Sequence, residues 1–339
     1  MKIDDIARLA NVSKSAVSLA INGKPGVSAK TREYILNIVE KYNYVPLRNV
    51  NSQSKKKGTI RFIACKSPDL INEYYQDLPF FNELISYLSS VINDYPYDLV
   101  ISTFDENTIL KELKEIEKEY SSEGIILLGT NLNKSQIRTI HNEYNNLIIL
   151  DTHHPEINAN FVSINNFLGG YQAAAYLIAQ GHEKIGYAKG IPTITNFKER
   201  KNGFFSKLEE VSMTILDKHI FEFSAMEIKD GSGVRNELKS LEELPTAIFC
   251  ENDYIAISLM KLLTKIGIKI PEQISIIGFD DISESRVITP ELTTLQVNKK
   301  EMAIQTLDLL DKIIKKDSET KHIQVNTSLI KRESFCPVE

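Results

Sequence analysis

The chain has 339 residues, of which 42% are hydrophobic and 25% charged, as in ordinary globular proteins, and this length suits a small domain beside a larger two-lobed one. No apolar run is long enough to cross a bilayer, and the first residues lack the apolar stretch of a secretory signal, so we expect a cytoplasmic protein. The three cysteines and six histidines show no metal-binding spacing. We therefore expect no metal site and no cofactor.

Charge is unevenly distributed along the chain. The first 58 residues contain eleven Lys and Arg against four Asp and Glu, a net of +7, and since the whole chain carries −5, the remainder carries −12. A basic segment on an acidic body is typical of a nucleic-acid-binding head, because its positive charges attract phosphates. The alternative is a basic face that is merely solvated.

Three short helices are predicted near the N-terminus. Apolar residues recur at helical spacing in IDDIARLA (3–10), in KSAVSLAI (14–21) and from Ser28 to about Tyr42. Ser13 and Ser28 begin the last two segments and are good N-caps, because a hydroxyl accepts a hydrogen bond from a free N–H of the first turn. Two short helices joined by a few residues and braced by a third form a helix-turn-helix unit.

We assign the helix-turn-helix domain to residues 1–46 and the polar segment 47–58 to a linker. From 59 to 339, apolar strand-like runs alternate with amphipathic helices, which predicts parallel, doubly wound α/β sheets, at this length in two lobes. The expected strands are 59–65, 97–103, 124–128, 147–151, 161–164, 184–190, 219–223, 246–250 and 274–279. The expected helices lie near 79–94, 107–120, 134–144, 167–180, 197–209, 232–241, 253–266 and 299–316.

Several motifs, in matching order and spacing, make the chain similar to the lactose-repressor (LacI) family of bacterial transcription regulators. They are IDDIARLANVSKSAVSLAINGKPGVSAKTREYILNIVEKYNYVP, GHEKIGY, the ER–GF pattern from Glu199 to Phe204, ENDYIA, IIGFDD with TPELTTL, and the ending SLIKRES. The resemblance implies a sequence-specific DNA-binding repressor of a sugar-utilisation operon, controlled allosterically by a small molecule, and not an enzyme. It also implies a periplasmic-binding-protein-like body, with lobe 1 at about 59–161 and 293–321 and lobe 2 at about 162–292 and 322–339.

The resemblance implies that the second helix of the head enters the major groove. Lys14 can donate to guanine, or else makes only a phosphate contact, whereas Leu19 can make only apolar contacts. Many family members have Arg where this chain has Leu19, so we expect a different operator base pair there. The implied groove residues are Lys14, Ser15, Ser18 and Leu19, and the implied phosphate contacts come from Ser13, Asn22, Ser28 and Thr31.

The linker departs from the family pattern. Tyr44 and Pro46 match it, but Gln53 stands where relatives have a leucine that wedges into the minor groove. Either this hinge folds weakly on DNA, or Gln53 reads the minor-groove edge by hydrogen bonds. Tyr44 and Gln53 complete the expected DNA-binding set.

The resemblance implies that the effector lies between the lobes, where polar residues follow the carboxyl ends of strands. Asp accepts hydroxyl hydrogens, Asn both donates and accepts, and Arg donates in a planar fork, which suits a sugar. Alternatives are that Asp151 caps a loop, that Arg200 pairs with Glu199 or Asp253, and that Asp281 rather than Asp280 points inward. The residues carried over are Asp151, Arg200, Asn252 and Asp280, with Phe223, Phe80 or Tyr74 as stacking rings.

We expect a homodimer, because two heads must match a palindromic operator. The helix at 79–94 is more apolar than one lobe requires, so part of it is predicted to form the dimer interface; the alternative is that it is all core. A sensor of a purine or nucleoside acting as corepressor, and a solute-binding protein without DNA function, are the competing functions. An NAD-dependent enzyme is disfavoured because no G-x-G-x-x-G follows the first strand.

Overall fold

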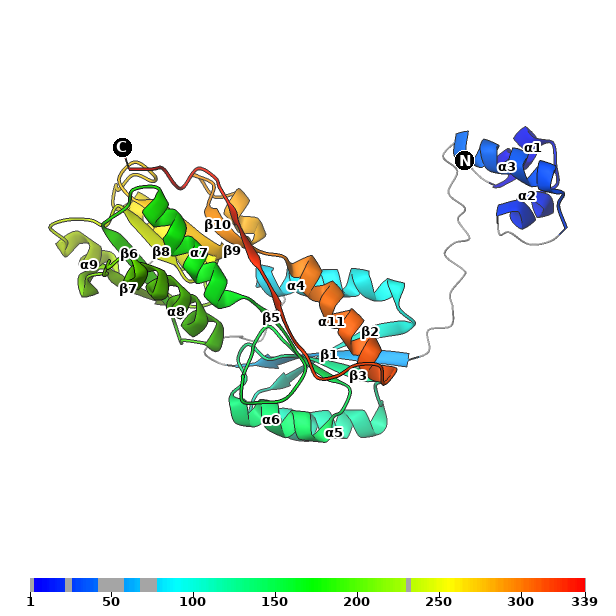
Figure 1. Cartoon of the computed structure of the whole chain (residues 1–339), viewed down its shortest axis with the longest axis horizontal. Coiled ribbons are helices and arrows are strands. Elements are labelled where there is room, and N and C mark those ends of the chain that lie inside the picture. The colour runs from blue at the N-terminus through cyan, green and yellow to red at the C-terminus, as the bar shows by residue number, and fades with distance from the viewer. Residues whose placement is uncertain (1–2, 22–25, 42–57, 68–77, 230–232, 339) are drawn as a thin grey trace. The chain divides into compact units, whose positions relative to one another are not determined.

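The computed structural model describes residues 3–21, 26–41, 58–67, 78–229 and 233–338 (Figure 1). The chain divides into two compact units, a head, Met1–Lys55, and a body, Lys56–Glu339. This division falls inside the predicted linker. Among the described residues, no helix is long and apolar enough to span a membrane.

The head contains three helices, α1 (Ile3–Ala10), α2 (Lys14–Ile21) and α3 (Ala29–Lys41). The Oγ of Ser13 accepts a hydrogen bond from the Ala16 N–H at 3.2 Å, so Ser13 is an N-cap as predicted. Ser28 caps α3 in the same way, through the Thr31 N–H at 3.1 Å. The side chains that pack the small core between the helices are Ile6, Ala7, Ala10, Val17, Ala20 and Ile35.

The first sheet of the body has the strand order β11-β5-β4-β3-β1-β2, with all neighbours parallel. Alternate residues of β1 face opposite sides: Phe62 lies in a core with α4 and α11, and Ile63 in a core with α5 and α6. Helices therefore cover both faces, as a doubly wound sheet requires (Figure 1). The elements are β1 (Gly58–Lys66), β2 (Tyr97–Asp105), β3 (Gly124–Leu128), β4 (Leu147–Leu150), β5 (Phe161–Ile164), β11 (His322–Val325), α4 (Pro79–Val91) followed by the 3-10 turn Ile92–Asp94, α5 (Ile109–Glu119), α6 (Lys134–Glu143) and α11 (Lys299–Ile314).

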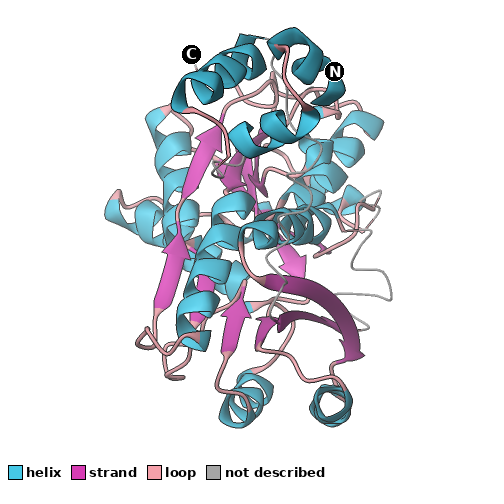
Figure 2. Cartoon of the chain, turned by 90° about the vertical axis from the view of Figure 1, so that its right-hand side faces the viewer, coloured by secondary structure: helices cyan, strands magenta, loops and turns pink. Residues whose placement is uncertain are grey.

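The second sheet has the order β12-β10-β9-β8-β6-β7, and its strands are parallel except that β12 is antiparallel to β10. Strands of the body lie between helices in the perpendicular view as well (Figure 2). The elements are β6 (Ile185–Ile191), β7 (Ile220–Ser224), β8 (Ala247–Cys250), β9 (Ser275–Asp280), β10 (Thr293–Val297), β12 (Thr327–Ile330), α7 (Asn166–Ala179), α8 (Thr195–Glu210), α9 (Arg235–Ser240), α10 (Asp253–Lys265) and the 3-10 turns Asp217–His219 and Ser283–Arg286.

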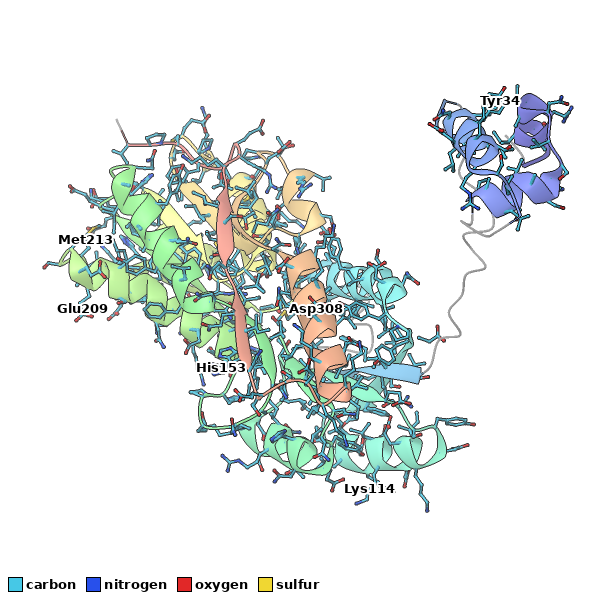
Figure 3. The ribbon with its side chains drawn as sticks, turned by 45° about the vertical axis from the view of Figure 1, so that its right-hand side comes forward. Tyr34, Lys114, His153, Glu209, Met213 and Asp308 are labelled. Atoms are coloured by element: carbon cyan, nitrogen blue, oxygen red, sulfur yellow. The ribbon has the colours of Figure 1, made fainter. Side chains whose placement is uncertain are left out.

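The chain crosses between the two sheets at Asn165, Asn298 and Asn326, which differs from the expected lobe boundaries by one strand each time. Strands β5 and β11 pair with each other in the first sheet, and β10 pairs with β9 in the second, so strand pairing decides the boundary. The Asn165 amide donates to Asn326 Oδ1 at 2.9 Å, which ties the first and third crossings together. Beside them His153, labelled in Figure 3, stacks on the ring of His322.

All nine expected strands are present, and β10, β11 and β12 were missed. These three are short and carry Thr, Gln and His, so they lack the continuous apolar run that marks the others.

The apolar face of α4 packs inside this chain. Phe80, Phe81, Leu84 and Leu88 are at most 5% exposed and belong to the body's core, so the core interpretation explains them and the predicted dimer role does not. Tyr87 of the same helix remains 39% exposed.

Candidate functional site

A small cavity lies between the two lobes at the carboxyl ends of their strands. It is partly open to solvent and has room for about one water molecule, about 20 Å³. Its lining combines carboxyl, amide, hydroxyl and guanidinium groups with aromatic and aliphatic side chains. The lining residues are Phe80, Phe81, Thr130, Asp151, Ile194, Asn196, Phe197, Arg200, Met226, Asn252, Tyr254 and Asp280.

Asp151 follows β4 and is buried against the cavity. Its carboxylate accepts hydrogen bonds from Thr130 Oγ1 at 2.5 Å and from Asn196 Nδ2 at 3.3 Å. Burial raises the pKa of Asp151 to about 6, although these hydrogen bonds and the charge of Arg200 oppose the shift. Asp151 therefore does more than cap a loop, because its carboxylate accepts hydrogen bonds from residues of both lobes.

Arg200 lies on α8 with its guanidinium fully buried. Its Nε donates to Asn166 Oδ1 at 2.9 Å, Nη1 to the Glu251 carbonyl at 2.5 Å and Nη2 to Asp280 Oδ1 at 3.0 Å. The guanidinium also stacks over the Phe279 ring, 3.6 Å from its centroid. Arg200 thus pairs with Asp280, and neither predicted alternative, Glu199 or Asp253, is its partner.

The position of Arg200 depends on a close crossing of α7 and α8. A Cβ on Gly170 would lie 1.9 Å from the Arg200 carbonyl oxygen, and a Cβ on Gly203 would lie 1.9 Å from the Phe167 carbonyl oxygen. Only glycine allows the two helix backbones to approach this closely.

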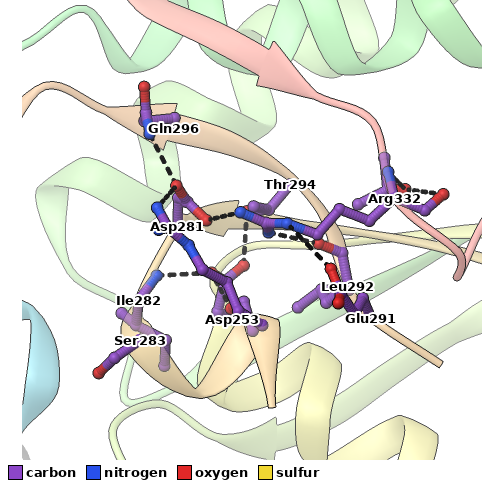
Figure 4. A network of polar contacts seen from close by, with 12 residues as sticks. Asp253, Asp281, Ile282, Ser283, Glu291, Leu292, Thr294, Gln296 and Arg332 are labelled. Atoms are coloured by element: carbon purple, nitrogen blue, oxygen red, sulfur yellow. Dashed lines mark hydrogen bonds and ion pairs between the residues drawn. The ribbon is translucent and has the colours of Figure 1, made fainter. Parts of the chain in front are cut away.

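Asp280 ends β9 and Asp281 follows it, and their side chains point to different partners. Asp280 lines the cavity, and burial raises its pKa to about 6, against the charges of Arg200 and Lys299. Asp281 points away, accepting from Arg332 Nη2 at 2.5 Å and from Gln296 Nε2 at 2.7 Å (Figure 4). Of the two alternatives left open by the sequence, Asp280 is the residue that faces the site.

Asn252 lines the cavity, but its amide is used within the fold. Its Oδ1 accepts from the Ile255 N–H at 3.0 Å, which caps α10, and its Nδ2 donates to the Ala225 carbonyl at 2.7 Å. Phe80 lines the cavity as expected. Phe223 does not: it points into the core of the second lobe from β7, and Met226 beyond the strand end lines the cavity instead. Tyr74 lies outside the described residues.

Seven lining residues were not predicted. Thr130 and Asn196 could have been found, because each follows a strand of a parallel sheet at its carboxyl end. The aromatic and aliphatic members have no such signal, since their residue types are those of any core. The seven are Phe81, Thr130, Ile194, Asn196, Phe197, Met226 and Tyr254.

In the head, Lys14 and Ser15 stand exposed in the first turn of α2, and Ser18 and Leu19 are half-buried. Leu19 packs close to Gly26, because a Cβ on that glycine would lie 3.0 Å from the Leu19 Cδ1.

The three remaining described residues of the expected DNA-binding set are polar. Ser13 and Ser28 are exposed N-caps, and the Ser28 and Thr31 hydroxyls are 2.7 Å apart. Asn22, Tyr44 and Gln53 lie outside the described residues.

Known proteins match this chain over nearly its whole length. Residues 2–47 match the family model of bacterial regulatory proteins, lacI family, and residues 174–335 match a periplasmic binding protein-like domain. The NTD biosynthesis operon regulator NtdR of Bacillus subtilis (strain 168) is 31% identical over 335 residues, covering 98% of this chain and 99% of the relative. The HTH-type transcriptional repressor PurR of Haemophilus influenzae (strain PittEE) is 30% identical over 337 residues, 98% of each chain.

Solved structures share the fold. The transcriptional regulator CelR in complex with cellobiose superposes with a TM-score of 0.69 at 22% identity, covering 99% of this chain and 100% of that one. The lac repressor dimer bound to operator and the anti-inducer ONPF superposes with a TM-score of 0.70 at 20% identity, covering 98% of each. With its head, its two-lobed body and its full-length relatives, the chain belongs to the lacI family of bacterial regulatory proteins.

Proposed function

We propose that this protein is a transcriptional repressor that acts in the cytoplasm, binds operator DNA through its head, and is controlled by a small neutral sugar held between the lobes. The observation that carries this proposal is the interlobe cavity, in which Asp151, Asp280 and Arg200 meet. Hydroxyl groups suit this set, since each carboxylate keeps acceptor positions, and the guanidinium keeps donors, beyond those already bonded.

The charge of the cavity favours a neutral ligand over an anionic one. Two carboxylates line it against one guanidinium, which already bonds Asp280. Phe80, Phe197 and Tyr254 supply rings against which the apolar face of a sugar can lie. Two related structures of the same fold contain cellobiose and ribose.

Ligand binding and lobe movement are coupled by size. In this conformation the cavity has room for about one water, so we infer that the lobes or the lining side chains separate when a sugar enters. A ligand that binds one lobe arrangement better shifts the population towards it, and so changes operator affinity.

For the DNA contacts, the exposed positions of Lys14 and Ser15 and the net charge of the first 58 residues support the predicted recognition helix. Ser13, Ser28 and Thr31 are proposed to contact phosphates, and Ser18 and Leu19 to contact bases. The roles of Asn22, Tyr44 and Gln53 remain predictions.

We further propose a homodimer, as in the lac repressor complex with operator. Strand β2 ends the first sheet, and its Val100 and Ile101 are each 41% exposed. An exposed apolar edge strand tends to be covered by another chain, so we place part of the dimer interface here rather than on the buried face of α4.

A purine or nucleoside corepressor is the second candidate, because PurR is among the full-length relatives. A thermal-shift screen of the full chain against sugars, purines and nucleosides separates the two. DNA from the region upstream of its own gene is then titrated with and without each hit. A sugar that shifts both melting and DNA affinity supports the proposal; a purine that tightens DNA binding supports the alternative; DNA binding that no compound changes contradicts both.

A further inference from the structure

Lys299 is a buried lysine at the start of α11, directly after the second crossing between the sheets. Only 4% of it is exposed, and its ammonium bonds three oxygens. They are Glu83 Oε2 at 2.9 Å, the Asp280 carbonyl at 3.0 Å and the Asp281 carbonyl at 3.1 Å. All three ammonium protons therefore have an acceptor, which is what a buried cation needs to stay charged.

The two carbonyls belong to an unusual turn. Asp280 has φ 112° and Asp281 has φ 50°, two successive left-handed conformations that cost energy in residues other than glycine. This turn sends the Asp280 side chain to Arg200 and the Asp281 side chain to Arg332, as described above. Because Lys299 binds both backbone carbonyls, it stabilises the conformation that aims Asp280 at the cavity.

Glu83 brings in the other lobe. It lies on α4, and besides Lys299 it accepts the Ser283 N–H of the second lobe at 3.2 Å. One turn earlier on α4, Phe80 lies with its ring 5.4 Å from the Lys299 ammonium, and its N–H donates to Tyr254 OH of the second lobe at 3.2 Å. The same ammonium thus contacts both the turn that carries Asp280 and the helix that carries Phe80.

We propose that Lys299 is a positioning residue of the interlobe site: its ammonium holds the Asp280–Asp281 turn of one lobe against α4 of the other, and opening of the lobes breaks this link. The link to ligand control rests on the proposed function. The link between the lobes is a property of the chain without ligand, so it is tested without one.

The first test is hydrogen exchange, followed by mass spectrometry, on the full-length protein. Lys299→Met removes the ammonium and keeps an apolar stem, and Lys300→Met, at the exposed next position, is the matched control. We expect exchange to rise about tenfold at 280–283 and in the first turn of α4, the factor that one charge-assisted hydrogen bond contributes to an opening equilibrium. A rise at 280–283 without one in α4, or no rise at all, would overturn the proposal.

The second test is a pH profile, which a mere packing role would not move. Lys299 lowers the pKa of Asp280, and the other groups that face this carboxyl are Arg200, Asp151, Asp253 and Tyr254, with Glu83 facing Lys299. Without Lys299 an ionised Asp280 is less well compensated, so the loss of melting temperature in Lys299→Met should grow from pH 5 to pH 8.

Placed in an Asp280→Asn background, Lys299→Met should lose that growth, because the titrating carboxyl is gone. A deficit independent of pH, or one that keeps its pH dependence in the Asp280→Asn background, refutes the pairing. If the ligand screen finds no sugar while both tests succeed, the proposed function fails and the interlobe link stands.

Discussion

Asp253 predicts how the stability of this protein depends on pH. It is fully buried at the start of α10, where its carboxyl accepts from Thr294 Oγ1 at 2.6 Å, Ser285 Oγ at 2.7 Å and the Ile282 N–H at 3.1 Å. The network is shown in Figure 4. Burial and the nearby charge of Asp280 raise its pKa to about 7, and the three hydrogen bonds only reduce that shift.

The sign follows from proton binding. The unfolded chain releases this proton near pH 4, whereas the folded protein keeps it up to about pH 7, so the folded state binds more protons in that interval. Stability therefore falls as pH rises from about 4 to 7. At about 1.4 kcal/mol for each unit of pKa shift, this one group lowers the free energy of unfolding by about 4 kcal/mol over the interval.

Asp253→Asn tests this reasoning. The amide has one acceptor oxygen where both carboxyl oxygens now accept hydrogen bonds, so the variant should be less stable than the wild type at pH 5. Because the amide cannot ionise, the variant should recover relative to the wild type at pH 7.5. Urea unfolding followed by circular dichroism measures both, with Asp317→Asn, an exposed aspartate, as the control. A deficit that is equal at the two pH values, or larger at pH 7.5, would refute the assignment of a raised pKa.

Three further predictions follow from the site and the surface. Arg200→Ala leaves Asp280 buried without its partner, so it should destabilise the body by roughly 3 kcal/mol and abolish the thermal shift by any ligand found. Lys198→Ala, exposed on the same helix, should change neither, and unchanged ligand binding in Arg200→Ala would show that the site is elsewhere. Lys14→Ala should weaken DNA binding, whether Lys14 contacts a phosphate or a guanine. A fall of about one in the slope of log affinity against log salt concentration indicates a phosphate contact, and relaxed specificity at one base pair indicates a guanine contact. Unchanged affinity contradicts both roles. Ile101→Lys should convert the dimer to a monomer in analytical ultracentrifugation, whereas Leu216→Lys, at a residue of the second lobe that is 53% exposed, should not. If both variants remain dimers, the interface lies elsewhere.

The pattern of the chain predicted its elements well because apolar periodicity is a local property. Nine strands and the helices of the head follow from it, as do the caps Ser13 and Ser28, whose partners lie three residues away. The family motifs then placed Asp151, Arg200 and Asp280 at one site, and the structure brings these three together.

Partners far apart in the sequence could not be found in this way. The choice between Asp280 and Asp281 depends on two left-handed residues and on Arg332, which comes 51 residues later. Phe223 was misplaced because it lies within β7, where strand alternation turns it into the core, whereas the cavity lies beyond the strand end and is lined there by Met226.

By itself, the sequence determined the fold class, the basic head and the group of polar residues at strand ends, because composition, periodicity and motif spacing carry that information. Only the tertiary structure decided which of those groups face the cavity, how little room they leave, and which residue links the lobes. Lys299 shows why: its three acceptors come from α4 and from the turn after β9, and a lysine at the start of a helix shows no sign of being buried until those segments pack around it.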